Sequence, residues 1–119
     1  MPEIKVTIPY TTVLSKNLSH YNIAINKRVP TKAYTVTLKV IGMLIRGEMN
    51  KRAVAFQKGK VWLDIMIYRP DMRADPPNFI DSICDGVKSA LGIDDRFYAG
   101  SWDWELDKKN PRIEIEVRQ

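Results

Sequence analysis

The chain has 119 residues and a formal net charge of +5, with 45% apolar and 28% charged residues. This length and composition indicate a single folded domain over residues 1–119, and they exclude a disordered chain. The only cysteine, Cys84, excludes an internal disulfide and a zinc site built from a cysteine cluster.

The sequence contains no obvious membrane or export signal. Its longest apolar run, "VIGMLI" over residues 40–45, is too short to cross a bilayer. The first residues, "MPEIKVTIPY", lack the basic and apolar regions of a signal peptide. We therefore expect a cytoplasmic protein with no membrane partner.

The first half of the chain is predicted to contain a strand, a basic loop and a helix. Residues 3–8, "EIKVTI", alternate apolar and polar side chains, as is typical of a strand. Residues 9–32 are polar and predict a long loop, which in a compact domain is usually functional or mobile. The segment 33–52 alternates like a strand at its start but has helical spacing over its length, and we favour a helix.

The second half is predicted to contain a strand, a helix and a hairpin. Residues 60–69 alternate like a strand, and apolar residues at helical spacing predict a helix over residues 76–91. "SWDWEL" at 101–106 and "RIEIEVR" at 112–118 alternate strictly and predict an antiparallel hairpin. These elements together predict an α+β fold with a small mixed sheet and two main helices.

Charge is distributed unevenly between the two halves. Residues 1–60 hold 11 Lys and Arg against 2 acids, whereas residues 61–119 hold 8 against 12. A basic half suggests a polyanionic partner such as DNA or RNA. An acidic half beside it suits a nuclease that places metal-binding carboxylates near a phosphate. Ordinary drift of surface charge along the chain explains the same numbers equally well.

Five aspartates lie within or next to the predicted helix 76–91, and they have two interpretations. They either hold a metal ion, or they cap and solvate the helix: Asp75 precedes Pro76 and fits an N-cap. A helix of this length spans about 24 Å, so acids at its two ends meet only if the chain turns back. The five are Asp75, Asp81, Asp85, Asp94 and Asp95.

The order of the elements and three short motifs resemble the RusA-type Holliday-junction resolvases. The motifs are "DPPN" at 75–78, "CDGV" at 84–87 and "IDD" at 93–95, and "KNLSHY" at 16–21 is similar to an asparagine-containing loop of that family. The resemblance implies a RusA-like fold and a homodimeric, Mg²⁺-dependent endonuclease. It also implies action on branched DNA in recombination and repair, and a prophage origin.

The resemblance also assigns roles to individual positions. Asp75 matches the family's first metal-binding aspartate and Asp95 the last one. Asn78 matches the family's asparagine, and Asp85 matches its mid-helix aspartate. Mg²⁺ prefers such oxygen ligands and retains several waters, so a substrate phosphate can complete its coordination.

Two positions depart from the family pattern. Pro77 stands where the family has its second aspartate, and Asp81 stands where it has a lysine that assists catalysis. Either the site is rebuilt, with Asp81 or Asp94 as a ligand, or activity is lost and DNA binding remains. We therefore expect Asp75, Asp95 and Asp81 as catalytic residues, and Asp75, Asp95 and Asp94 as Mg²⁺ ligands.

DNA contacts are predicted from the basic side chains of the loop and from arginines near the acids. The arginines would stabilise charge on the phosphate, or they form salt bridges with the same acids. An alternative from another class is a small phage or plasmid interaction protein with no nucleic-acid role. The predicted contacts are Lys16, Lys27, Arg28, Lys32, Arg69 and Arg73.

Overall fold

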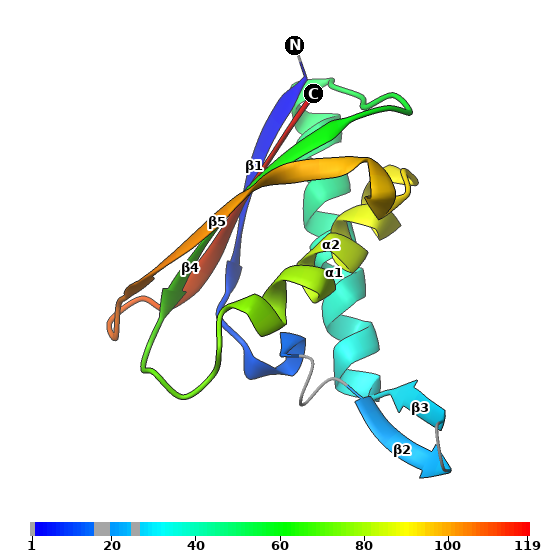
Figure 1. Ribbon diagram of the computed structural model, residues 1–119. Helices are drawn as coiled ribbons and strands as arrows, with labels where there is room; N and C mark the ends of the chain where they lie inside the picture. The colour runs from blue at the N-terminus through cyan, green and yellow to red at the C-terminus, as the bar shows by residue number, and fades with distance from the viewer. Residues whose placement is uncertain (1, 16–19, 25–26) are drawn as a thin grey trace.

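The computed structural model in Figure 1 describes residues 2–15, 20–24 and 27–119, and gives the backbone alone for residues 20–24 and 27–30. Two helices lie on one face of a four-stranded mixed sheet. The predicted α+β class, with a small mixed sheet and two main helices, is confirmed. The elements are β1 (Glu3–Pro9), a 3-10 helix η1 (Thr12–Leu14), β2 (His20–Ala24), β3 (Lys27–Pro30), α1 (Lys32–Arg52), β4 (Val61–Arg69), α2 (Pro77–Leu91), a 3-10 helix η2 (Asp95–Phe97), β5 (Tyr98–Leu106) and β6 (Arg112–Arg118).

The core lies between the sheet and the helices. Strand β4 buries every second residue, so Val61, Leu63, Ile65 and Ile67 face the helices. Strands β1 and β6 alternate in the same way. Burial of these branched apolar side chains is the main favourable contribution to folding. Among the residues that the structure describes, no helix covers the opposite face of the sheet (Figure 1).

The predicted hairpin between residues 101–106 and 112–118 is wrong. Both segments are strands, but β4 lies between them, and the sheet order is β1-β6-β4-β5. Strand β5 runs parallel to β4, while β6 runs antiparallel to it. Alternation identifies a strand but not its partner, and residues 107–111 are long enough to pass the end of β4. The backbone N–H of Asp107 donates to the carbonyl of Arg69 there, at 2.9 Å.

The ambiguous segment forms helix α1, as we favoured. Thr31 caps its start by accepting a hydrogen bond from the N–H of Tyr34 at 3.1 Å. Tyr34, Ile41 and Ile45 form the buried stripe. Their helical spacing therefore prevails over the strand-like alternation at the start of the segment.

The predicted loop 9–32 holds more structure than expected. It contains η1 and the antiparallel pair β2–β3, which forms a separate two-stranded sheet. In Figure 1 this hairpin projects from the domain beside the N-terminal end of α1. Loop composition alone did not reveal the pair, because its residues are mostly polar.

In the part of the chain that the structure describes, neither helix has the length and apolar character needed to span a membrane.

Candidate metal and DNA-binding site

Helix α2 places the acidic residues on its outer side. Its buried residues include Phe79, Ile83 and Val87, which fix the face that packs on the core. The helix ends at Leu91, and Gly92 caps it with a left-handed φ of 68° that favours glycine. Asp81 and Asp85 are exposed on the opposite side. The helix thus carries a row of carboxylates, with one at its start and two beyond its end.

Asp75 lies just before α2, and the capping interpretation of this residue is wrong. The N-cap position belongs to Pro76, the helix begins at Pro77, and no side chain caps it. Only the backbone carbonyl of Asp75 is used, accepting from the N–H of Asn78 at 3.0 Å. Among the described residues no hydrogen bond or ion pair engages the exposed Asp75 carboxylate. It therefore stands unpaired near the positive end of the helix dipole.

The loop that carries Asp75 is held in place by Arg69. The Arg69 side chain is almost fully buried, and it donates to the carbonyls of Asp71 at 3.0 Å and Ala74 at 2.5 Å. Its guanidinium also lies 4.8 Å from the ring centre of Trp104. These contacts use the guanidinium inside the protein, so it is not exposed for contact with a DNA phosphate.

Asp94 and Asp95 lie beyond the other end of α2. Asp94 caps η2 by accepting from the N–H of Arg96 at 3.0 Å, and Lys88 lies 3.9 Å from its other oxygen. The pKa of Asp94 is lowered, chiefly by the hydrogen bond from Arg96. Asp94 is therefore ionised, as a metal ligand must be. Asp95 is exposed beside it.

The charges of the acids converge near the middle of α2. The pKa of the Cys84 thiol is raised to about 11, chiefly by burial and then by the charges of Asp81, Asp95 and Asp85, in that order. The thiol is therefore neutral and a poor nucleophile near pH 7. Asp85 also accepts a hydrogen bond from the hydroxyl of Tyr34 at 3.2 Å, which ties the acidic face to α1.

The predicted Mg²⁺ ligands do not come together within one chain. Asp75 and the pair Asp94–Asp95 lie at opposite ends of the 15-residue helix α2, which spans about 22 Å. Within the described residues, no three His, Cys, Asp or Glu side chains gather as a metal site. A single copy therefore offers two separate partial sites, one at each end of α2.

The predicted DNA contacts lie in different parts of the molecule. Lys32 is the exposed first residue of α1, and Arg73 is exposed in the loop before α2, 3.6 Å from Asp71. Lys27 and Arg28 belong to β3, but their side chains lie outside the described part. Lys16 falls outside the described residues altogether.

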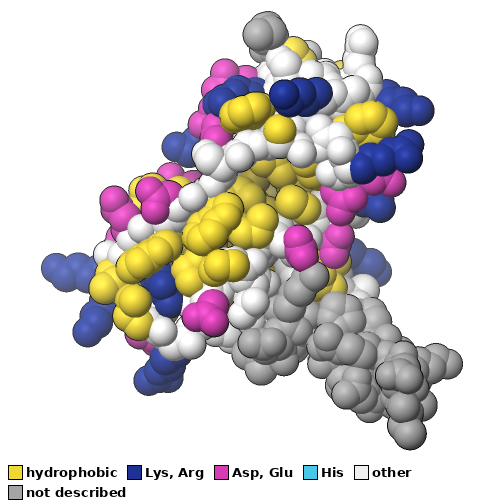
Figure 2. All heavy atoms as spheres, viewed as in Figure 1, with side chains coloured by type: hydrophobic (Ala, Val, Ile, Leu, Met, Phe, Trp, Pro, Cys, Tyr) yellow, Lys and Arg dark blue, Asp and Glu magenta, His cyan; other side chains and the backbone are white. Residues whose placement is uncertain are grey.

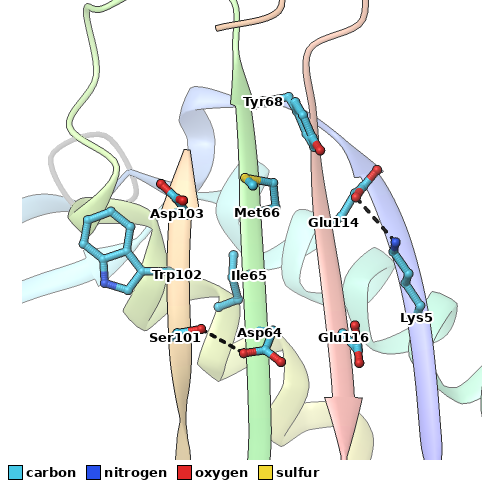
Figure 3. A pocket seen from close by; sticks show the side chains of 10 residues that line it. All are labelled: Lys5, Asp64, Ile65, Met66, Tyr68, Ser101, Trp102, Asp103, Glu114 and Glu116. Carbon is cyan, nitrogen blue, oxygen red and sulfur yellow. Dashed lines mark hydrogen bonds and ion pairs between the residues drawn. The ribbon is translucent and has the colours of Figure 1, made fainter. Parts of the chain in front are cut away.

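The outer face of the sheet carries charged residues that were not among the predicted site residues. Figure 3 shows Lys5 reaching Glu114 and Ser101 reaching Asp64, at 3.6 and 2.9 Å. Arg118 also donates to Asp64 at 2.7 Å. Glu114 and Asp64 thus form ion pairs with neighbouring cations, whereas Asp75 forms none among the described residues. Polar residues alternating along β4 and β6 were the signal that could have revealed this face.

In comparisons with known proteins, no family model and no curated protein matched the chain. The resemblance to RusA-type resolvases therefore rests on the element order and on the short motifs around α2.

Proposed function

We propose that this chain is a Mg²⁺-dependent endonuclease that cuts branched DNA, such as Holliday junctions, and acts as a homodimer in recombination and repair. The observation that carries the proposal is the pair of acidic positions at the two ends of α2. Asp75 is exposed and unpaired among the described residues, and Asp94 and Asp95 are two adjacent carboxylates. The wide separation of these positions calls for a second copy.

A two-fold dimer would complete the site. If the α2 helices of two copies run antiparallel across the axis, Asp75 of one copy approaches the partner's acidic pair. Each dimer then has two identical composite sites. A four-way junction has near two-fold symmetry, so two matched sites suit the symmetric cutting of two strands.

The chemistry requires an activated water and stabilisation of charge on the phosphate. When bound, Mg²⁺ supplies both functions. The carboxylates of Asp75, Asp94 and Asp95 would hold it through oxygen ligands, which Mg²⁺ prefers. The guanidinium of Arg73 is exposed two residues before Asp75 and is available to a phosphate. Asp81, one turn into α2, is the candidate for a proton acceptor or an additional ligand.

The basic half of the chain is the proposed DNA surface. Residues 1–60 carry the positive excess, and the β2–β3 hairpin projects beside the exposed Lys32. Lys27 and Arg28 belong to this hairpin, so they would contact phosphates on the arms of a junction.

The departures at Pro77 and Asp81 support a second candidate function, a junction-binding protein with an impaired catalytic site. Pro77 has no carboxylate, and Asp81 adds a negative charge where the resolvases have a positive one. Binding without cleavage would follow from both changes.

A labelled four-way junction, incubated with and without Mg²⁺, tests the proposal. Paired cuts that require Mg²⁺ support the nuclease, and tight binding without cuts supports the impaired relative. An interaction protein with no nucleic-acid role would neither bind nor cut the junction, and that result would overturn both candidates.

A further inference from the structure

Strand β5 is an open edge of the sheet. It runs for nine residues beside β4 and, among the described strands, pairs with no other. From Gly100 to Leu106 all its residues are exposed. Natural proteins usually protect or pair such an edge, because its backbone N–H and C=O groups template the addition of another strand.

The side chains of β5 leave a large apolar surface on the same side of the sheet as the helices. Trp102 and Trp104 are paired in register with the buried Ile65 and Ile67, so they point to the helix side. Yet Trp102 is 43% exposed, Trp104 36% and Leu106 54%. Figure 2 shows a continuous apolar patch over this part of the molecule.

An apolar groove runs between β5 and α2. Ile80 and Cys84 of α2 form one wall, and Tyr98 and Trp102 of β5 form the other, with a volume of about 270 Å³. Exposed aromatic side chains beside an apolar groove mark a surface that binds another macromolecule.

We propose that β5 pairs antiparallel with β5 of a second copy of this chain, about a two-fold axis at Trp102. The two four-stranded sheets then form one continuous sheet, and the apolar grooves of the two copies face each other. This dimer deepens the proposed function and rests on it, because it supplies the antiparallel α2 helices of the composite site.

The charges along β5 favour this register. When Trp102 lies opposite the partner's Trp102, Asp103 lies opposite the partner's Ser101, and Glu105 lies opposite the partner's Ala99. An axis moved to Asp103 would place that carboxylate against itself, and an axis at Trp104 would place it against the partner's Glu105. Like charges directly opposite each other destabilise a strand pair. Strand β5 contains no Lys or Arg to offset them.

The same register also covers a position of β5 that has no side chain. Gly100 approaches β4 so closely that a Cβ there would lie 1.6 Å from the carbonyl oxygen of Leu63. Its partner across the axis is Trp104, whose ring would cover the strand where Gly100 has no side chain. One local bond must be exchanged, because the N–H of Trp104 now donates to Asp103 Oδ1 at 2.7 Å.

Pairing of β5 would also affect the loop that carries Asp75. The ring of Trp104 lies against Arg69, and Arg69 holds the carbonyls of Asp71 and Ala74. A partner strand over Trp104 would therefore reinforce the position of the first acid of the site.

Helix α1 carries a competing apolar stripe. Val36, Val40, Met43 and Leu44 are 40–65% exposed along its outer side. A helix face offers no unpaired backbone groups, because its N–H and C=O groups are bonded within the helix. Strand β5 offers both apolar side chains and an unpaired backbone edge, which is why we place the second copy there.

The test is sedimentation at micromolar concentration, without DNA or Mg²⁺, so that the result does not depend on nuclease activity. The wild-type chain should be a dimer. Trp102→Glu and Trp102→Lys should each be monomeric, with dissociation constants raised more than about a hundredfold, because each places like charges opposite each other at the axis. An equimolar mixture of the two should form a one-to-one heterodimer, which also shows that both variants fold. Met43→Glu, on the α1 stripe, is the matched control and should remain dimeric.

Three results would overturn the β5 dimer: a monomeric wild type, a Trp102→Glu variant that stays dimeric, or variants that fail to pair when mixed. A monomeric wild type that still cuts junctions would reject the β5 interface but support the nuclease function. A dimer with the expected mixing behaviour but no cleavage would support the β5 interface and reject the nuclease function.

Discussion

At the level of single residues, Asp75 differs from the other acids near α2 in its surroundings. Asp94 is bonded to the N–H of Arg96, and Asp85 accepts from Tyr34. The carboxylate of Asp75 has no such contact among the described residues, and Asp75 lies just before the positive end of a helix. An exposed unpaired carboxylate in this position is available to a cation.

Pro77 is the residue whose replacement tests the site most selectively. It is the first residue of α2, where a proline and an acid are both tolerated, because the first N–H groups have no partner within the helix. Pro77→Asp should cost less than about 1 kcal/mol of stability and should add the acid that the resolvases have. Calorimetry should show tighter Mg²⁺ binding, and junction cleavage should appear or rise.

The double variant Pro77→Asp with Asp81→Lys tests whether Asp81 is a metal ligand or only replaces the lysine of the resolvases. If Asp81 is only a departure from the family pattern, the added lysine should raise cleavage further. If Asp81 is a working ligand, the same change should abolish cleavage. A folded Pro77→Asp variant with unchanged Mg²⁺ affinity and unchanged cleavage would remove Asp75 from the proposed site.

At the level of elements, the pairing of β4 with β5 depends on one glycine. Gly100 has a φ of 143°, and a Cβ there would meet the backbone of Leu63. Gly100→Ala should therefore destabilise the protein by more than about 3 kcal/mol. The control is Gly47→Ala in α1, where a Cβ would meet nothing within 4 Å and should stabilise by about 0.5–1 kcal/mol. Urea denaturation measures both; equal stabilities would contradict this role of Gly100.

The elements themselves could mostly be predicted from the sequence, whereas their partners could not. Periodicity located β1, α1, β4, α2 and β6, because each buries a regular stripe of apolar residues. Alternation also located β5, although this strand is exposed from Gly100 to Leu106. It could not show that β4 separates β5 from β6, since alternation carries no information about the neighbouring strand. For the same reason, motif spacing brought Asp75 and Asp95 into one predicted site, although α2 holds them at opposite ends.

At the level of the whole molecule, the uneven charge should appear in the salt dependence of binding. Junction affinity should fall steeply with salt, because phosphate contacts release counterions. Replacing Lys27, Arg28 and Lys32 with alanine should reduce the slope of log affinity against log salt by about 2–3. A matched control replaces three exposed lysines elsewhere in the chain, Lys58, Lys108 and Lys109, and should leave most of the slope. Equal losses in both variants would mean that net charge alone drives binding.

Mixing two inactive variants tests whether each active site combines acids from two copies of the chain. Asp75→Asn and Asp95→Asn should each abolish Mg²⁺-dependent cleavage and keep junction binding. In an equimolar mixture allowed to exchange subunits, mixed dimers contain one intact composite site, so about a quarter of all sites should be restored and nicking should return. An exchanged mixture that stays inactive, or a single variant that cleaves like the wild type, would contradict the claim.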